Sequence, residues 1–319
     1  MTVASVEEDP SSSAGGAAQI LARSSVLVDV LGKNIFDRTV STLQKFASLP
    51  PSMVSEGTPD GHFLPPQTKR RTSFVSAWEE SVAEYVRHGV EHLLLLRVNA
   101  YHELDYSHLL KFHLETNSAL TQAYAPDGSL EIALVSASQL RNAESCLAGV
   151  SSLIPGHRRF VFNGYVNRLR GAPDFYRLVS DGLHGVCALT PAGVEVGERV
   201  WVGADVEIDA SATIGAPAFI GAGSRVAACS TIAETTSVER NCEIDCGTTV
   251  RQSWILPNTY VGMALTVRRS VVSNRRLFHL DRKVAITCGD PRLVGPRRKS
   301  GPLLTKMQSL LRYEPQSAE

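Results

Sequence analysis

The chain has no long hydrophobic run, and this absence limits where the protein can act. No apolar stretch in its 319 residues approaches the roughly 20 residues that a membrane-spanning helix requires. The first residues include Glu7, Glu8 and Asp9 where a secretion signal would be basic and then apolar. The sequence therefore predicts a cytoplasmic protein without a membrane span.

Cysteine is sparse and follows no metal-binding pattern. The six cysteines lie at positions 146, 187, 229, 242, 246 and 288. Cys242 and Cys246 are four residues apart, but no second pair and no nearby histidine completes a zinc site. Free thiols in a reducing compartment are the expected state, and no structural metal is expected.

The chain also lacks an excess of either charge, because 32 Lys and Arg balance 32 Asp and Glu. The charges are not evenly distributed along the chain, however. From Arg275 to the C-terminus there are ten basic and four acidic residues, a net charge of +6, so the remainder carries −6. A solvated basic tail explains this better than an anionic partner, and nucleic-acid binding is not expected, because the run at 297–299 has no interleaved aromatic residues.

What the sequence does contain is a ladder of aliphatic residues between 196 and 250. Every sixth residue is Val or Ile, at positions 196, 202, 208, 214, 220, 226, 232, 238, 244 and 250. The residue after each is often Gly or Ala, and four places further on the residue is small or β-branched. A six-residue period of this kind is typical of a parallel β-helix, in which short strands bury their apolar side only by stacking.

This pattern resembles the left-handed β-helix, whose coil takes three hexads. Three columns of stacked side chains are then expected: 196/214/232/250, 202/220/238 and 208/226/244. The period slips near Pro257 and resumes at Val267. A β-sandwich of alternating strands is the less favoured alternative.

The region before the ladder alternates predicted helices and strands, which favours an α/β layer domain. We expect helices after Asn34, after Thr72 or Ser73, and over 107–116, a buried strand at 93–96 and a hairpin around Asp127. The predicted organisation is a disordered tail at 1–18, an α/β domain at 19–185, a β-helix at 186–280 and a basic tail at 281–319. Leu303 to Leu311 has the spacing of one amphipathic helix, which could pack back or pair with another subunit.

Three segments of the first domain resemble motifs of the sugar-nucleotide pyrophosphorylases, such as mannose-1-phosphate guanylyltransferases and glucose-1-phosphate nucleotidylyltransferases. Residues 28–34 (VDVLGKN) resemble the family segment PVxGKP. Residues 94–113 (LLLRVNAYHELDYSHLLKFH) resemble fLvlnGDvltdldlsxLlxfH, and residues 164–176 resemble GYWxDIGTPxDY with one extra residue. The resemblance covers about residues 20–280 and implies a Rossmann-like nucleotidyltransferase domain followed by a left-handed β-helix.

The departures from the family pattern affect its catalytic groups. The Gly-rich phosphate loop is largely missing, since Ile20-Leu21-Ala22 is followed at once by Arg23-Ser24-Ser25. The phosphate-contacting lysine falls at Ser25. The first metal-binding aspartate falls at Asn99, and the second falls near Arg168, or at Asn167 if the gap moves. Because Mg²⁺ requires anionic oxygen ligands, the resemblance predicts no Mg²⁺ cofactor and impaired pyrophosphorylase catalysis.

We therefore expect a pseudoenzyme-like protein of sugar-nucleotide or polysaccharide metabolism, with a binding, regulatory or scaffold role. Its expected partners are a sugar nucleotide or sugar phosphate, and either further copies of itself or an active paralogue. The candidate binding residues are Lys33, Asn99, Glu103, Asp105 and Arg168. No catalytic residue is assigned.

Two alternatives remain open. One is an active sugar-1-phosphate nucleotidylyltransferase with a rearranged site. The other is a hexapeptide-repeat acyltransferase, which generally uses a β-helix histidine as general base. The nine histidines all lie outside residues 185–278, and only His184 and His279 flank the ladder, so this alternative is less favoured.

Overall fold

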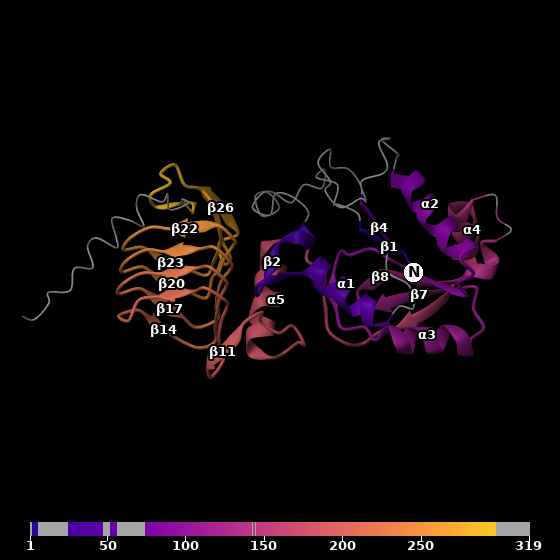
Figure 1. Ribbon diagram of the computed structural model, residues 1–319, viewed down its shortest axis with the longest axis horizontal. Helices are drawn as coiled ribbons and strands as arrows, with labels where there is room; N and C mark the ends of the chain where they lie inside the picture. Colours follow the sequence, from indigo (N-terminus) through magenta and orange to yellow (C-terminus); the bar gives the residue numbers. More distant parts are fainter. Residues whose placement is uncertain are drawn as a thin grey trace, which may run out of the picture.

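The computed structural model describes residues 2–5, 25–46, 52–55, 74–141, 143 and 145–297. It places a domain of helices around a mixed sheet beside a stack of short strands, with the helix α5 and the hairpin β2–β3 between them (Figure 1). None of the described helices is long and apolar enough to cross a membrane.

A six-stranded sheet forms the centre of the first domain. Its strand order is β4-β1-β5-β8-β7-β9, with parallel pairing of β1 to β4 and β5 and of β7 to β9, and antiparallel pairing elsewhere. The strands are β1 (Thr2–Ser5), β4 (Ser52–Ser55), β5 (His92–Leu96), β7 (Leu120–Ala125), β8 (Gly128–Ser136) and β9 (Arg158–Val161). The sheet is compatible with the expected α/β class, although it is mixed.

Strand β5 is buried on both faces, as predicted from its run of leucines. Leu93 is packed with α2 residue Val82 in one apolar cluster, whereas Leu94 and Leu96 belong to a second cluster that includes Leu109 of α3. Side chains alternate across a strand, so one leucine run supplies both cores. The helices are α1 (Ile35–Phe46), α2 (Phe74–Arg87), α3 (Tyr106–Glu115), α4 (Cys146–Leu153) and α5 (Ala172–His184), with 3₁₀ turns at Ser25–Leu27, Ala137–Gln139 and Ile154–Gly156.

Three of these helices begin where the sequence predicts. Asn34 Oδ1 accepts the Asp37 backbone N–H at 2.7 Å, and Asp105 accepts that of Ser107 at 2.8 Å, so both side chains cap helix N-termini. Helix α2 begins at Phe74, directly after the predicted Thr72 or Ser73. The hairpin around Asp127 also forms, as β7 and β8.

Residues 2–5 differ from the prediction of a disordered tail over 1–18, because they form β1 between β4 and β5. The rest of that segment lies outside the described residues. The predicted basic tail over 281–319 likewise contains β26 (Val284–Thr287) and β27 (Val294–Pro296), which pair with strands of the β-solenoid. Backbone pairing, which composition does not encode, ties both segments to neighbouring strands.

Residues 200–273 form a parallel β-solenoid with three faces, and one further strand on either side of this range pairs antiparallel with it. The strands are β11 (Val194–Gly197), β12 (Val200–Val202), β13 (Glu207–Ile208), β14 (Thr213–Ile214), β15 (Ala218–Ile220), β16 (Arg225–Val226), β17 (Thr231–Ala233), β18 (Thr236–Val238), β19 (Glu243–Ile244), β20 (Thr249–Arg251), β21 (Trp254–Ile255), β22 (Thr259–Val261), β23 (Thr266–Arg268), β24 (Ser270–Ser273) and β25 (Arg276–His279). The sheet orders are β11-β12-β15-β18-β21-β24-β25-β26, β13-β16-β19-β22-β27 and β14-β17-β20-β23.

The predicted columns form, with two corrections. Ile214 pairs in register with Ile232 and then Val250, as expected. Val196 does not join that column, because β11 turns back and pairs antiparallel with β12. The period also slips earlier than Pro257: Ile255 follows Val250 by five residues and stacks on Val238.

Hydroxyl groups inside the corners link one coil to the next. Ser224 Oγ accepts the Cys242 backbone N–H at 2.9 Å and donates to the Glu239 carbonyl at 2.8 Å. Thr248 similarly accepts from Leu265 N and donates to the Gly262 carbonyl. The small residues of the repeat are therefore often polar because they satisfy buried backbone groups between coils.

One apolar core joins the two parts. Trp254 of the solenoid stacks on Phe175 of α5, with ring centroids 5.7 Å apart, and both side chains are fully buried. The hairpin of β2 (Asp29–Val30) and β3 (Lys33–Asn34) packs against the same face, where Glu239 accepts the backbone N–H groups of Leu31 at 2.9 Å and Gly32 at 2.8 Å. The junction is therefore packed as a domain interior.

Candidate functional site

The connection between β5 and α3 is the best-defined candidate site. It runs from Arg97 to Asp105, contains the short strand β6 (Tyr101–His102), and is held by β10 (Val166–Asn167), which pairs with β6. The connection leaves the carboxyl end of β5, and ligands of open α/β sheets bind beyond the carboxyl ends of strands. Three predicted residues, Asn99, Glu103 and Asp105, lie on it.

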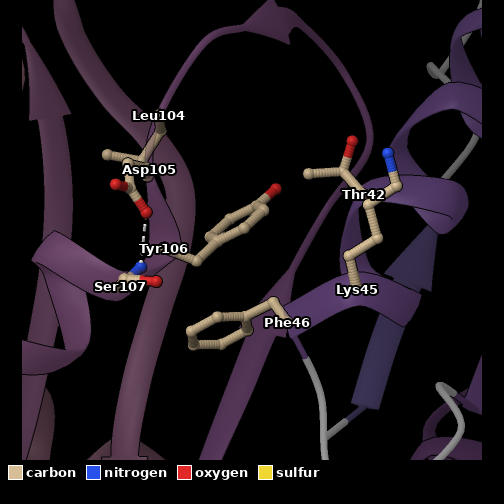
Figure 2. Close-up of a pocket in the computed structure, with 7 residues that line it drawn as sticks. All are labelled: Thr42, Lys45, Phe46, Leu104, Asp105, Tyr106 and Ser107. Carbon is tan, nitrogen blue, oxygen red and sulfur yellow. Dashed lines mark hydrogen bonds between the residues drawn. The ribbon is translucent and has the colours of Figure 1, made fainter.

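A hollow of about 410 Å³ opens beside this connection (Figure 2). It is lined from α1 by Thr42, Lys45 and Phe46, and from the start of α3 by Leu104, Asp105, Tyr106 and Ser107. The walls therefore come from two helices that are separate in the sequence. The volume lies in the range of small-molecule sites, between about 300 and 1,000 Å³.

The Tyr106 hydroxyl is the central polar group of this hollow. Figure 2 shows it directed toward the α1 wall, with Thr42 across the gap. Only 4% of the Tyr106 side chain is exposed, and burial raises the pKa of its hydroxyl. No described residue hydrogen-bonds this hydroxyl. Because the hydroxyl faces the hollow, it is placed to exchange a hydrogen bond with a ligand there.

The rest of the lining combines one cation, one carboxylate and an aromatic surface. Lys45 is exposed at the end of α1. One carboxylate oxygen of Asp105 caps α3, and the other lies 3.8 Å from Nε2 of His108. The Phe46 and Tyr106 rings pack together with centroids 5.7 Å apart. Such a surface suits a ligand with a flat or ring-shaped body, hydroxyl groups and one negative charge.

Asn99 and His102, deeper in the connection, carry unpaired polar atoms. Within the described residues, Asn99 Oδ1 and His102 Nδ1 are buried without a hydrogen-bond partner. Burial, and secondarily the charge of Arg168, lowers the pKa of His102 to about 4, so the ring is neutral at pH 7. The His102 ring meets Tyr106 edge-on, with ring centroids 6.0 Å apart, so His102 packs directly against a residue that lines the hollow.

Arg168 is fully engaged elsewhere. Its Nε and Nη2 donate to the two carboxylate oxygens of Asp127, and its remaining donors reach the carbonyls of Gly128 and Ser129. This bidentate pair lowers the pKa of Asp127 and fixes the β7–β8 turn. Arg168 is thus a structural residue of the hairpin, where the resemblance expects a metal carboxylate.

Lys33 and Glu103 are also held by neighbouring groups. Lys33 Nζ donates to Ser41 Oγ at 2.9 Å, and Lys33 does not line the hollow. Glu103 accepts from the Tyr101 hydroxyl at 3.2 Å and from the Ala188 backbone N–H, which ties the connection to the segment after α5. Of the predicted binding residues, Asp105 alone lines the hollow.

A metal does not fit the residues at these positions. Asn99 is neutral and Arg168 is a cation that already neutralises Asp127, so neither can supply the anionic oxygen that Mg²⁺ requires. In the described part of the chain, no group of three or more His, Cys, Asp or Glu side chains is placed to hold a metal. His184 and His279 lie outside the coil ladder, on α5 and β25, as the sequence indicates.

Sequence reasoning did not identify Thr42, Lys45, Phe46, Tyr106 or His102 as site residues. Lys45 and Phe46 end a predicted amphipathic helix, where a lysine and a phenylalanine are ordinary. No spacing rule connects them with Tyr106, 60 residues further on. The contact depends on how α1 packs beside α3, which only the tertiary structure provides.

Comparison with known proteins does not assign the chain to a group. No protein-family model matches the sequence, and no curated protein is significantly similar to it.

Proposed function

We propose that this protein binds a sugar phosphate or sugar nucleotide in the hollow between α1 and α3, and that it does so without pyrophosphorylase catalysis. The carrying observation is the Tyr106 hydroxyl, which no described residue hydrogen-bonds and which faces the hollow beside Lys45 and the Asp105 carboxylate. Lys45 would contact the phosphate, Asp105 and Tyr106 would bond hydroxyl groups, and Phe46 would contact the ring of the sugar or base.

The absence of pyrophosphorylase catalysis is argued from charge. Nucleotidyl transfer depends on cations that neutralise the charge developing on the phosphates. The residues at the two expected metal positions are Asn99 and Arg168, and Arg168 is committed to Asp127. We place the protein in sugar-nucleotide or polysaccharide metabolism, with a regulatory or scaffold role alone or beside an active paralogue. The nucleotidyltransferase ancestry of the first domain and the left hand of the solenoid belong to this proposal and rest on the sequence motifs.

Thermal denaturation against a panel of sugar 1-phosphates and sugar nucleotides, with and without Mg²⁺, tests the binding. A ligand at about 100 times its dissociation constant adds roughly 2.7 kcal/mol to the free energy of unfolding. We expect one ligand class to raise the midpoint equally with and without Mg²⁺. In calorimetry, Lys45→Ala should weaken binding about 10-fold or more, as for a lost charged hydrogen bond, and Tyr106→Phe by about 2- to 10-fold.

Lys111→Ala is the matched control, since Lys111 is an exposed lysine on α3 outside the hollow, paired with Glu115. It should leave the affinity unchanged. A shift that requires Mg²⁺, or pyrophosphate release with any common sugar phosphate, would contradict the proposal and favour an active enzyme with a rearranged site. No shift with any ligand would leave a scaffold role, and the binding proposal would be wrong.

A further inference from the structure

The first coil of the β-solenoid presents an open apolar end. Val194 is 71% exposed, Val196 64% and Ile208 39%, although ladder residues in the middle of the stack, such as Ile232 and Ile244, are fully buried. Val194 pairs with Val202 of the first coil, so it extends the apolar interior face beyond that coil. Adjacent exposed aliphatic residues of this kind mark a surface that is covered by something.

The rim of this open end is acidic. Residues 194–211 contain five acidic residues and one arginine, a net charge of −4. The acidic side chains belong to exposed residues, namely Glu195, Glu198, Asp205, Glu207 and Asp209. The segment that covers this end should therefore combine aliphatic residues with positive charge.

The described chain ends beside the stack of coils, within reach of this rim. Strand β27 pairs with β22, and the Arg297 backbone N–H donates to the Asn258 carbonyl at 2.8 Å. The Arg297 side chain then reaches back along the stack, to the carbonyl of Gly223 and within 4.0 Å of Glu243. Gly223 lies one coil from the first, since its N–H bonds the Ala204 carbonyl.

The distance from Asn258, beside which the described chain ends, to the open first coil is short. The corner of Asn258 is three coil steps from that of Asp205, through Asn241 and Gly223, or about 15 Å at roughly 4.8 Å per step. Five residues in extended form, 298–302, span up to about 17 Å. The chain beyond them can therefore reach the first coil.

The sequence beyond Arg297 has the required chemistry. Residues 298–312 carry four basic residues, 298, 299, 306 and 312, and no acidic residue. The apolar residues Leu303, Leu304, Met307, Leu310 and Leu311 have the spacing of one helical stripe. These residues lie outside the described part of the chain, and a helix of nine residues would be about 13.5 Å long.

We propose that residues 303–311 of the chain dock, as an amphipathic helix, on the open first coil of its own β-solenoid. Their apolar stripe covers Val194, Val196 and Ile208, while the basic residues of the segment lie against the acidic rim. The occupant is the chain's own segment, because its reach, its apolar spacing and its charge all match this surface.

Hydrogen exchange of the full-length protein tests the docking. In Leu304→Glu/Met307→Glu, amide exchange over residues 194–208 should rise about 10-fold or more, because the cover of this edge is lost. Thr305→Glu/Ser309→Glu adds the same charge on the opposite side of the predicted helix and should leave exchange as in wild type. Equal exchange in all three proteins would overturn the proposal.

The reciprocal variant is Val196→Glu, with Val284→Glu as its control, since Val284 is an exposed valine on β26. Trypsin cleavage after Lys306 and Arg312 should be faster in Val196→Glu than in wild type, and unchanged in Val284→Glu. Light scattering should give both variants the mass of the wild type. If Val196→Glu lowers the mass while the tail variants do not, a second copy covers this end and the proposal is wrong.

Discussion

Among single residues, Glu239 is a buried carboxyl group that joins the solenoid to the β2–β3 hairpin. It is fully buried and accepts from four donors, the backbone N–H groups of Leu31 and Gly32, Ser237 Oγ and Trp254 Nε1. Burial still dominates and raises its pKa to about 7. The carboxyl group therefore orients the β2–β3 hairpin on the solenoid at an electrostatic cost that depends on pH.

The sign of this dependence follows from the raised pKa. Well below pH 4.5 the Glu239 carboxyl group is protonated in both the folded and the unfolded state, so its burial carries no ionisation cost. As the pH rises to 7, this group ionises first in the unfolded chain, and the free energy of unfolding falls. We expect the free energy of unfolding of wild type, relative to Glu239→Gln, to fall by about 2–3 kcal/mol between pH 4.5 and 8, from urea titrations.

The comparison with Glu239→Gln is needed because buried histidines act in the opposite direction. The pKa values of His102 and His113 are lowered to about 4, so both favour folding above pH 6.5 and lose this effect as the solution is acidified. Both histidines are present in wild type and in the variant, so their effect cancels. A difference that is flat, or that grows with pH, would show that the four donors keep Glu239 ionised.

At the scale of the element, close approach between coils decides which ladder positions must be glycine. A Cβ on Gly221 would lie 2.5 Å from Arg240 N and 2.6 Å from Glu239 C, both backbone atoms of the next coil. A Cβ on Gly215, the same position of another hexad, would meet its nearest neighbour at 3.6 Å. The repeat is therefore uniform in sequence but not in packing.

We expect Gly221→Ala to lower the free energy of unfolding by about 1–3 kcal/mol or more, because neither backbone can move without loss of the Gly221 to Val238 hydrogen bond. Gly215→Ala should change it by less than about 0.5 kcal/mol. Chemical denaturation followed by circular dichroism measures both. Equal effects of the two substitutions would mean that a tight corner, common to both positions, sets the requirement for glycine.

For the whole molecule, the shared core implies that the two parts unfold together. Phe175 and Trp254 stack across the junction, and the same apolar cluster extends from Leu94 in the central sheet to Phe278 in the solenoid. Each part also has an apolar cluster of its own, but this shared cluster spans both. We therefore expect the described parts to unfold as one cooperative unit.

This predicts coincident denaturation curves from tryptophan fluorescence and from circular dichroism in the wild-type protein. Phe175→Ala should lower stability by about 3–5 kcal/mol and separate the two curves. Phe112→Ala, which removes a ring that packs on Phe160 away from the junction, should lower stability while the curves stay coincident. Separate transitions in wild type would show that the junction is weaker than its burial suggests.

The sequence alone determined the β-solenoid and most helices of the first domain. A period of six residues is a local property repeated along the chain, and helix caps such as Asp105 act within one turn, so both can be read without knowledge of distant contacts. The place of Val196 could not be read in this way, because its β11 turns back on β12 when no further coil follows.

Only the tertiary structure decided the hollow and the junction. Tyr106 and Lys45 lie 61 residues apart, and Glu239 lies more than 200 residues from the hairpin that it holds. Arg168 was identified from the sequence as a departure from a metal-binding pattern, but its bond to Asp127 depends on the path of the β7–β8 turn. Such contacts arise when separate elements pack together, and pattern within one segment carries no information about them.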